Sequence, residues 1–163
     1  MARPDRFESL MKEARRDVDA SRVVVTLARA DGALSRYVEE ALGPTGVTIP
    51  QFNVLMELAS TPEGALPLSQ LARRLLKSPP NITSLIDRLE RAGSVRRTRG
   101  APDRRVVMAE ITEHGWQALG RAAPAVFAAE KRLVTCLSRD RRRDLRRLLD
   151  TLTAEATASA SAS

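Results

Sequence analysis

The spacing of apolar residues along the chain predicts a mainly helical protein. Apolar side chains recur at steps of three and four residues from about Phe7 to Leu42, which is the period of an amphipathic helix. The segment from Gly43 to Gly46 contains a proline between its two glycines and ends this helix. A second helix is expected after Thr48, where Pro50 occupies an early helical position.

Two shorter helical patterns follow, joined by a tight turn. The first covers residues 68–76, and the second begins with the capping residue Ser78, continues with Pro79 and runs to Gly93. Apolar positions share one side of the second pattern, and the outward side carries Asn81, Ser84, Arg88 and Arg91. Two short helices in tandem form the helix-turn-helix pattern, in which the second helix lies in the major groove of DNA.

A basic β-hairpin is expected directly after these helices. Val95–Arg99 is a β-type run, and Gly100–Asp103 has the residues of a turn. Arg105–Ile111 alternates between inward and outward positions, as a half-buried strand does. The sequence therefore predicts a basic hairpin directly after the helix pair.

The C-terminal part is expected to be helical and then disordered. Thr112 stands at an N-cap position and opens a helix to about Leu137, and Ser138 opens another. The run from Ser138 to Arg147 holds six arginines interleaved with two aspartates at the spacing of helical ion pairs, which indicates a surface or dimer-rim face. The small and polar residues from Thr153 to Ser163 predict a disordered tail.

Composition narrows the classes of function. With 163 residues, 43% hydrophobic and 29% charged, the chain is expected to form one domain, or one small domain with a dimerisation extension. The single cysteine, Cys136, permits no intrachain disulfide and is expected to be a small buried residue. The single histidine, His114, and its neighbour Trp116 are expected to cap or pack rather than catalyse.

Several signals that would indicate other functions are missing from the sequence. There is no glycine-rich phosphate loop, no metal-ligand constellation and no credible pair of catalytic carboxylates, so we expect no enzymatic activity, cofactor or metal. Neither a secretory signal nor an apolar stretch of about 18 residues is present. We therefore expect a cytoplasmic protein without a membrane partner.

The positive charge is concentrated in one segment. The whole chain carries a net charge of +7 at pH 7. Residues 88–105 contain seven arginines against Glu90 and Asp103, a net +5, so most of the excess lies on the second helix of the pair and on the hairpin. Arginine binds phosphates and base edges through its planar guanidinium. This distribution indicates double-stranded DNA as a partner.

Four segments, in consistent order, resemble the MarR family of transcription regulators. They are residues 49–55 (IPQFNVL), residues 68–75 (LSQLARRL), residues 81–93 (NITSLIDRLERAG), and Asp103–Arg105 followed by Ile111 and Thr112. The resemblance covers about residues 45–115. It implies a homodimer with a mainly α (α+β) fold, namely a winged helix-turn-helix with a two-stranded β wing and N- and C-terminal dimerisation helices.

The resemblance also implies a division of the chain. We expect an N-terminal dimerisation helix in residues 1–44, a DNA-binding lobe in residues 45–112, C-terminal dimerisation helices in residues 113–152 and the disordered tail in residues 153–163.

Individual residues receive roles from the same resemblance. Asp103 and Arg104 would brace the wing tip by an ion pair, and Arg105 would enter the minor groove there. The second helix would read the major groove. With the arginine-rich segment, the candidate DNA-binding residues are Asn81, Thr83, Ser84, Arg88, Arg91, Arg97, Arg104 and Arg105.

The sequence departs from the family pattern at two places, and it offers one candidate ligand site. Pro79-Pro80 restricts the start of the second helix, and Ser94 stands where the family has a larger apolar residue, which predicts looser packing of the wing. Many relatives respond to small aromatic or phenolic anions. Tyr37, Phe52 and Met56 are the candidates for such a site here, although Phe52 and Met56 also fit an ordinary core.

The expected function is therefore sequence-specific regulation of transcription. The hypothesis is a homodimeric repressor of a pseudo-palindromic operator, released by a small aromatic or phenolic effector. The alternative is a basic nucleic-acid or chromosome-associated protein that uses the same charge without reading bases.

Overall fold

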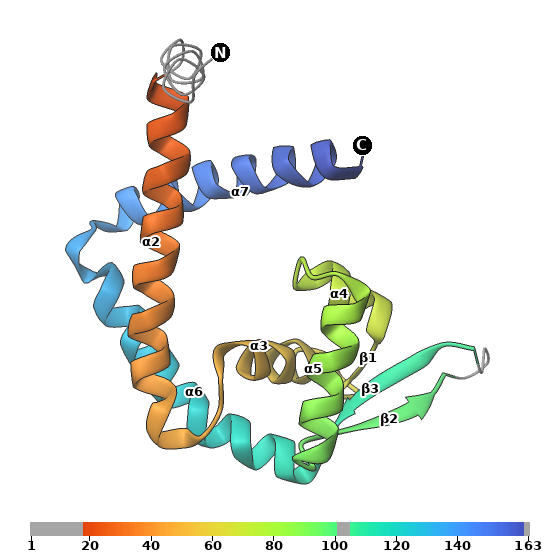
Figure 1. Ribbon diagram of the computed structural model, residues 1–163. Coiled ribbons are helices and arrows are strands. Elements are labelled where there is room, and N and C mark those ends of the chain that lie inside the picture. Colours follow the sequence, from red (N-terminus) through yellow and green to blue (C-terminus); the bar gives the residue numbers. More distant parts are fainter. Residues whose placement is uncertain (1–17, 101–104, 162–163) are drawn as a thin grey trace, which may run out of the picture.

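Two long helices, α2 (Val18–Leu42) and α7 (Arg139–Ser161), extend from a lobe that holds most other elements (Figure 1). The computed structural model describes residues 18–100 and 105–161. Between the two helices the chain forms the 3-10 turn η2 (Gly43–Thr45), α3 (Ile49–Ala59), β1 (Ala65–Pro67), α4 (Leu68–Arg74), α5 (Pro79–Arg91), β2 (Val95–Arg99), β3 (Val107–Ile111), α6 (Glu113–Leu133) and the 3-10 turn η3 (Val134–Cys136). This order confirms the predicted winged helix-turn-helix. No helix within the described ranges is both long and apolar enough to cross a membrane.

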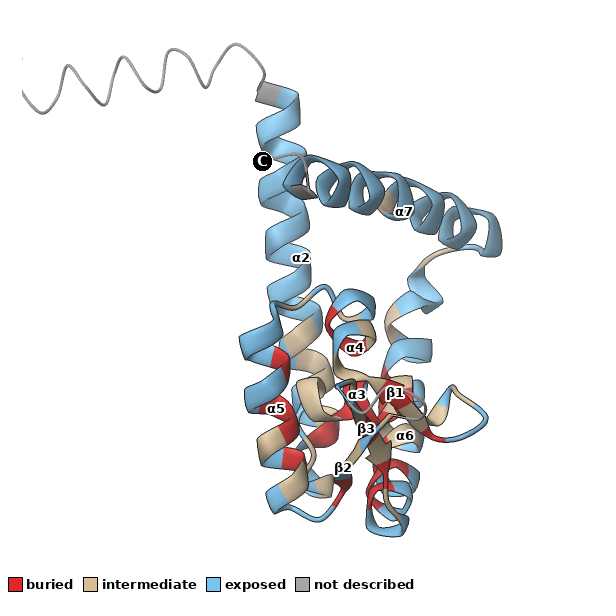
Figure 2. Ribbon diagram, turned by 90° about the vertical axis from the view of Figure 1, so that its right-hand side faces the viewer, coloured by how far each residue is buried: buried red, intermediate tan, exposed pale blue. Residues whose placement is uncertain are grey.

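The hydrophobic core lies in the lobe, where α3, α4, α5, the sheet and the first half of α6 meet (Figure 2). Leu42 is buried at the end of α2, and Val38 packs against the same core one turn earlier. The N-terminal half of α2 and nearly all of α7 are exposed (Figure 2). The lobe thus contains the apolar contacts of the fold, whereas the two long helices expose their apolar positions.

The helix pair is formed by α4 and α5, and both bury one side. Leu71 and Ala72 of α4 pack against the apolar side of α5, whose buried residues are Ile82, Leu85, Ile86 and Leu89. The turn between the helices contains Leu76, which adopts a left-handed conformation with φ 50°. A left-handed residue reverses the chain direction within a few residues, and this turn therefore sets α5 across α4.

The sheet has three strands rather than the two that the sequence predicts. β2 and β3 form the expected antiparallel hairpin, and β1 pairs antiparallel with the other edge of β3, giving the order β1-β3-β2. Leu66 of β1 lies opposite Ala109 of β3, and both side chains are buried. The additional strand anchors the base of the wing to the lobe.

Hydrogen bonds to backbone groups join the end of α5 to the start of α6. Gly93 is left-handed at φ 71°, and the Ser94 N–H donates to the Leu89 carbonyl at 2.9 Å, which closes α5 as a Schellman turn. The Thr112 hydroxyl accepts from the Gly115 N–H at 3.1 Å, as an N-cap does, and donates to the Gly93 carbonyl at 2.6 Å. Thr112 therefore caps one helix and ties it to the end of the other.

Ser94 fills its position closely, although its small size predicts looser packing. It is buried, its hydroxyl lies 3.3 Å from Nδ1 of His114, and its carbonyl accepts from the Thr112 N–H at 3.1 Å. His114 is thus an exposed residue of the first turn of α6 that lies within hydrogen-bond distance of Ser94.

The chain differs from the prediction near its C-terminus. Residues 153–161 are helical and continue α7, so the predicted disorder of residues 153–163 is wrong as far as Ser161, and residues 162–163 lie outside the described ranges. Alanine, which has the highest helix propensity, is frequent in this segment. The Thr153 hydroxyl donates to the Leu149 carbonyl at 2.9 Å, so its polar group is satisfied within the helix. Cys136 is exposed rather than buried. Residues 7–17, predicted to be helical, also lie outside the described ranges.

We predict that Gly115→Ala destabilises the fold by about 1–3 kcal/mol or more, because an added Cβ overpacks the junction. This Cβ would collide with the Ser94 carbonyl oxygen and lie 2.7 Å from Cγ1 of Ile111. Gly120→Ala is the matched control in the same helix, since nothing lies within 4 Å of its Cβ position. The control should gain about 0.5–1 kcal/mol from helix propensity. Denaturant unfolding of both variants measures the difference, and equal midpoints would contradict the close approach.

Candidate nucleic-acid interface

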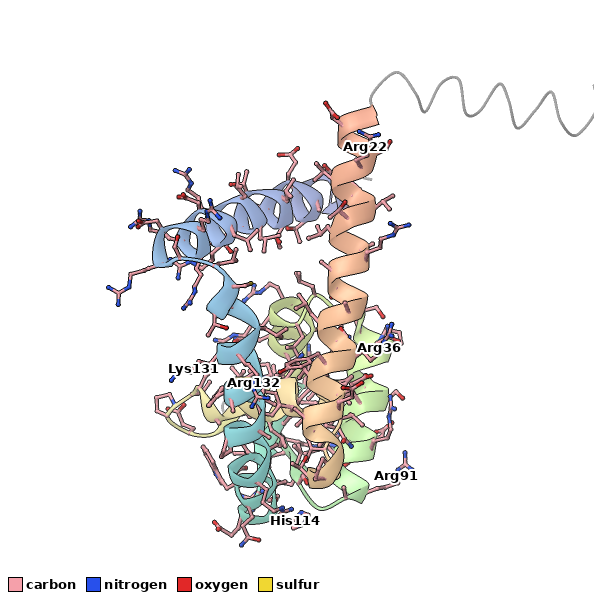
Figure 3. The ribbon with its side chains drawn as sticks, turned by 90° about the vertical axis from the view of Figure 1, so that its left-hand side faces the viewer. Arg22, Arg36, Arg91, His114, Lys131 and Arg132 are labelled. Atoms are coloured by element: carbon pink, nitrogen blue, oxygen red, sulfur yellow. The ribbon has the colours of Figure 1, made fainter. Side chains whose placement is uncertain are left out.

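The outward side of α5 is polar, basic and accessible. Its exposed residues are Asn81, Thr83, Ser84, Arg88 and Arg91, while the opposite side is buried in the lobe. Figure 3 shows Arg91 projecting into solvent from the C-terminal end of the helix. Backbone carbonyls one turn earlier hold both arginines, because Nε of Arg88 donates to Ser84 O at 3.4 Å and Nε of Arg91 donates to Asp87 O at 3.2 Å.

The start of α5 has few backbone donors. Pro79 and Pro80 occupy its first positions and carry no N–H group. The Thr83 hydroxyl donates to the Pro79 carbonyl at 3.0 Å. Two of the N–H groups that often bind phosphate at a helix start are therefore missing from α5.

The wing, whose strand β2 starts next to the end of α5 (Figure 1), carries further arginines. Arg99 and Arg105 are exposed on either side of the wing tip. Arg96 forms an ion pair with Glu110 of β3 at 2.5 Å across the hairpin. The proposed bracing pair, Asp103 and Arg104, lies outside the described residues.

Arg97 is placed differently from the other wing arginines. In the β2–β3 register it lies opposite the buried Ala109, on the same face of β2 as the buried Val95, so its side chain turns toward α5. Its guanidinium donates to Asp87 Oδ1 and to Glu90 Oε2, both at 2.5 Å. The expected DNA-binding residue Arg97 is therefore bound to the helix beside it.

The electrostatics of these pairs follow from their contacts. Partial burial of the Arg97 guanidinium disfavours its charge, but hydrogen bonds to Asp87 and Glu90 outweigh that effect and raise the pKa of Arg97. In the hairpin, the hydrogen bond from Arg96 lowers the pKa of the Glu110 carboxyl. These contacts therefore stabilise the charged forms of the Arg97 guanidinium and of the Glu110 carboxylate.

The three expected ligand residues are not brought together in one site. Phe52 is buried in the core and Met56 packs against it, as the core interpretation of these two residues predicts. Tyr37 lines a cavity of about 400 Å³ between α2 and α6. The other residues that line it are Glu40, Ala41, Ala125, Ala128, Ala129 and Arg132. Sequence reasoning missed Arg132, because its approach to Tyr37 depends on how the two helices cross.

Comparison with known proteins supports a DNA-binding assignment. A model of the MarR family matches residues 45–106. The HTH-type transcriptional repressor Rv2887 of Mycobacterium tuberculosis is 32% identical over 77% of this chain and 89% of its own length. The structure of AbsC, a MarR family transcriptional regulator from Streptomyces coelicolor, matches with a TM-score of 0.80 and 25% identity over 85% of this chain and 94% of that one. The transcriptional repressor CouR, solved bound to a 23-mer DNA duplex, matches with a TM-score of 0.72 and 32% identity over 78% and 89% of the two chains.

Proposed function

Because this chain belongs to the MarR family, whose relatives described above are helix-turn-helix transcription regulators, we propose that it represses transcription by binding a pseudo-palindromic operator as a homodimer. Each copy would insert α5 into the major groove and place its wing over the adjacent minor groove. Two-fold symmetry sets the centres of the half-sites one helical turn apart, about 10 base pairs.

The observation that carries this proposal is the exposed outer side of α5 next to the basic wing. Asn81, Ser84 and Arg88 are exposed at the positions from which a recognition helix reaches base edges. Arg105 stands at the wing tip, from which an arginine can enter a narrow minor groove. Residues 45–112 would thus bind DNA, and the helices on either side, in residues 1–44 and 113–152, would form the dimer.

The dimer proposal rests on apolar surface that a single copy leaves in water. Val24 and Leu27 of α2 and Leu148 and Leu152 of α7 are 41–66% exposed. A largely apolar groove of about 680 Å³ runs between these two helices. Exposed apolar residues gathered along one groove mark a surface for association, and a second copy would supply a matching apolar face.

The first test is selective binding. Operator duplexes are selected from genomic fragments with the full chain, and their affinity is then compared with that of bulk DNA at fixed salt. We expect a preference of about 10³-fold or more for the selected duplex, because base contacts add to the phosphate contacts. Equal affinity for both DNAs would favour the sequence-indifferent alternative.

We predict that Arg105→Ala weakens operator binding and reduces the magnitude of the slope of log K against log salt by about 1.8, because each copy in the proposed dimer loses one phosphate or groove contact. Arg147→Ala is the control. Arg147 is exposed on α7, so this substitution removes the same charge at a place away from α5 and the wing. Titrations at several salt concentrations measure both slopes. Equal slopes for Arg105→Ala and the unmodified chain would remove Arg105 from the interface.

We predict that Leu148→Glu shifts the protein from dimer to monomer at micromolar concentration and weakens operator binding in parallel, because a buried charge at the apolar face lacks a partner. Ala154→Glu adds the same charge on the opposite side of α7 and should leave the mass unchanged. Sedimentation equilibrium gives the mass. A monomer in the unmodified chain, or a dimer that tolerates Leu148→Glu, would contradict this interface.

The cavity between α2 and α6 is the candidate binding site for a small effector. Tyr37 and the alanines that line it offer an apolar wall for a small aromatic ring, and Arg132 offers a positive charge to an anionic group. A ligand releases the operator only if it binds the DNA-free arrangement of the dimer more tightly than the DNA-bound one.

We predict that aromatic or phenolic carboxylates bind the protein and weaken its operator complex, while the corresponding neutral amides bind less well. Arg132→Gln should remove most of the difference between acid and amide, because the charge-assisted hydrogen bond is lost. Calorimetric titration with the matched pair of compounds measures it. A panel in which no acid binds, or in which Arg132→Gln leaves the preference intact, would reject the cavity as the effector site.

A further inference from the structure

We propose that Arg97 is a positioning residue of the DNA interface, which fixes the wing against the recognition helix and does not itself contact DNA. The inference rests on the proposed function, since it concerns how the same surface is held for operator binding. It changes the role that the arginine-rich sequence predicts for this residue.

The contacts of Arg97 span two turns of α5. Its guanidinium donates to the Thr83 carbonyl at 3.3 Å, to Asp87 Oδ1 at 2.5 Å and to Glu90 Oε2 at 2.5 Å. These acceptors are four and three residues apart and therefore share one side of the helix. The Arg97 N–H also donates to Glu90 Oε1 at 3.0 Å, so Glu90 holds both the backbone and the side chain of β2.

The exposed fractions agree with a structural link. The Arg97 side chain is 27% exposed, against 64% for its neighbour Arg96. To reach a phosphate, the Arg97 guanidinium would have to give up charge-assisted hydrogen bonds to two carboxylates, which are stronger than neutral ones. The planar Arg97 guanidinium already bonds to several acceptors of one helix, so it is better suited to holding β2 against α5 than to binding DNA.

The link also has an electrostatic effect on the interface. Asp87 and Glu90 lie on α5 beside the exposed Arg88 and Arg91, where two uncompensated carboxylates would repel phosphate groups. Arg97 gives each carboxylate a partner and directs both toward the wing. The outer side of α5 then presents its arginines without an opposing charge beside them.

The test compares operator binding by Arg97→Met and by the double variant Arg97→Met/Glu90→Gln. The double variant keeps the local charge, because one cation and one anion are removed together, yet it breaks the link between β2 and α5. A positioning role predicts that both variants lose about tenfold or more in operator affinity and lose preference over bulk DNA, while the double variant keeps the salt slope of the unmodified chain.

Three results would overturn the inference without affecting the proposed function. A salt slope whose magnitude falls by about 1.8 in the double variant, one contact for each copy of the dimer, would show that Arg97 contacts phosphate. Unchanged operator affinity in both variants would show that the link is not needed for binding. Equal losses on operator and bulk DNA would show that it does not serve base reading. If the unmodified chain has no preferred duplex, the proposed function itself fails.

A further variant separates positioning from folding. Arg97→Lys retains the positive charge but cannot form the same planar set of bonds. Circular dichroism identifies a temperature at which every variant is folded. Hydrogen exchange of the β2 and β3 amides is then measured at that temperature. We expect faster exchange in the hairpin, unchanged exchange in α2, and an operator affinity between those of the unmodified chain and Arg97→Met. An Arg97→Lys variant that matches the unmodified chain in affinity and exchange would reject the geometric role.

Discussion

The fold depends on the close approach of three backbones where α5 ends, β2 begins and α6 starts. Gly93 turns the chain, Thr112 bonds to it, and Gly115 leaves space for the Ser94 carbonyl. Helix α6 continues from this point past α2 to the extended α7 (Figure 1). The orientation of the recognition helix is thereby tied to the helices that carry the exposed apolar faces. In the proposed dimer, such a link would couple the orientation of each recognition helix to the packing of the helices that join the two copies.

The charges near α5 divide into those that are bound within the protein and those that remain accessible. Arg96 and Arg97 form ion pairs with Glu110, Asp87 and Glu90. Among the described residues, no carboxylate pairs with Arg88 or Arg91 on the outer side of α5, and both arginines bond to backbone carbonyls. The net charge of a segment therefore overstates the number of residues available to DNA. What decides the role of each arginine is whether a carboxylate lies within its reach.

Much of this architecture can be predicted from the sequence, because helical periodicity and capping residues act locally. The buried side of α5, the N-cap at Thr112 and the hairpin strands all follow from such signals. β1 could not be predicted, since it has three residues, includes Pro67 and becomes a strand only by pairing with β3. The role of Arg97 had a signal that charge counting overlooks: it alternates in phase with Val95 and therefore faces inward. At the end of α7, the small polar residues indicate disorder, but the alanines between them favour the helix that is observed.

The position of the cavity beside Tyr37 suggests how the two ends of the molecule communicate. It lies between α2 and α6, and these helices connect the lobe to the exposed apolar faces. In the proposed dimer, the angle between α2 and α6 would set the separation of the two recognition helices. A ligand that filled the space beside the lining alanines would release DNA only by binding one angle more tightly than the other. The wing need not move relative to α5 for this to occur, because the Arg97 bonds keep them together while the whole lobe turns.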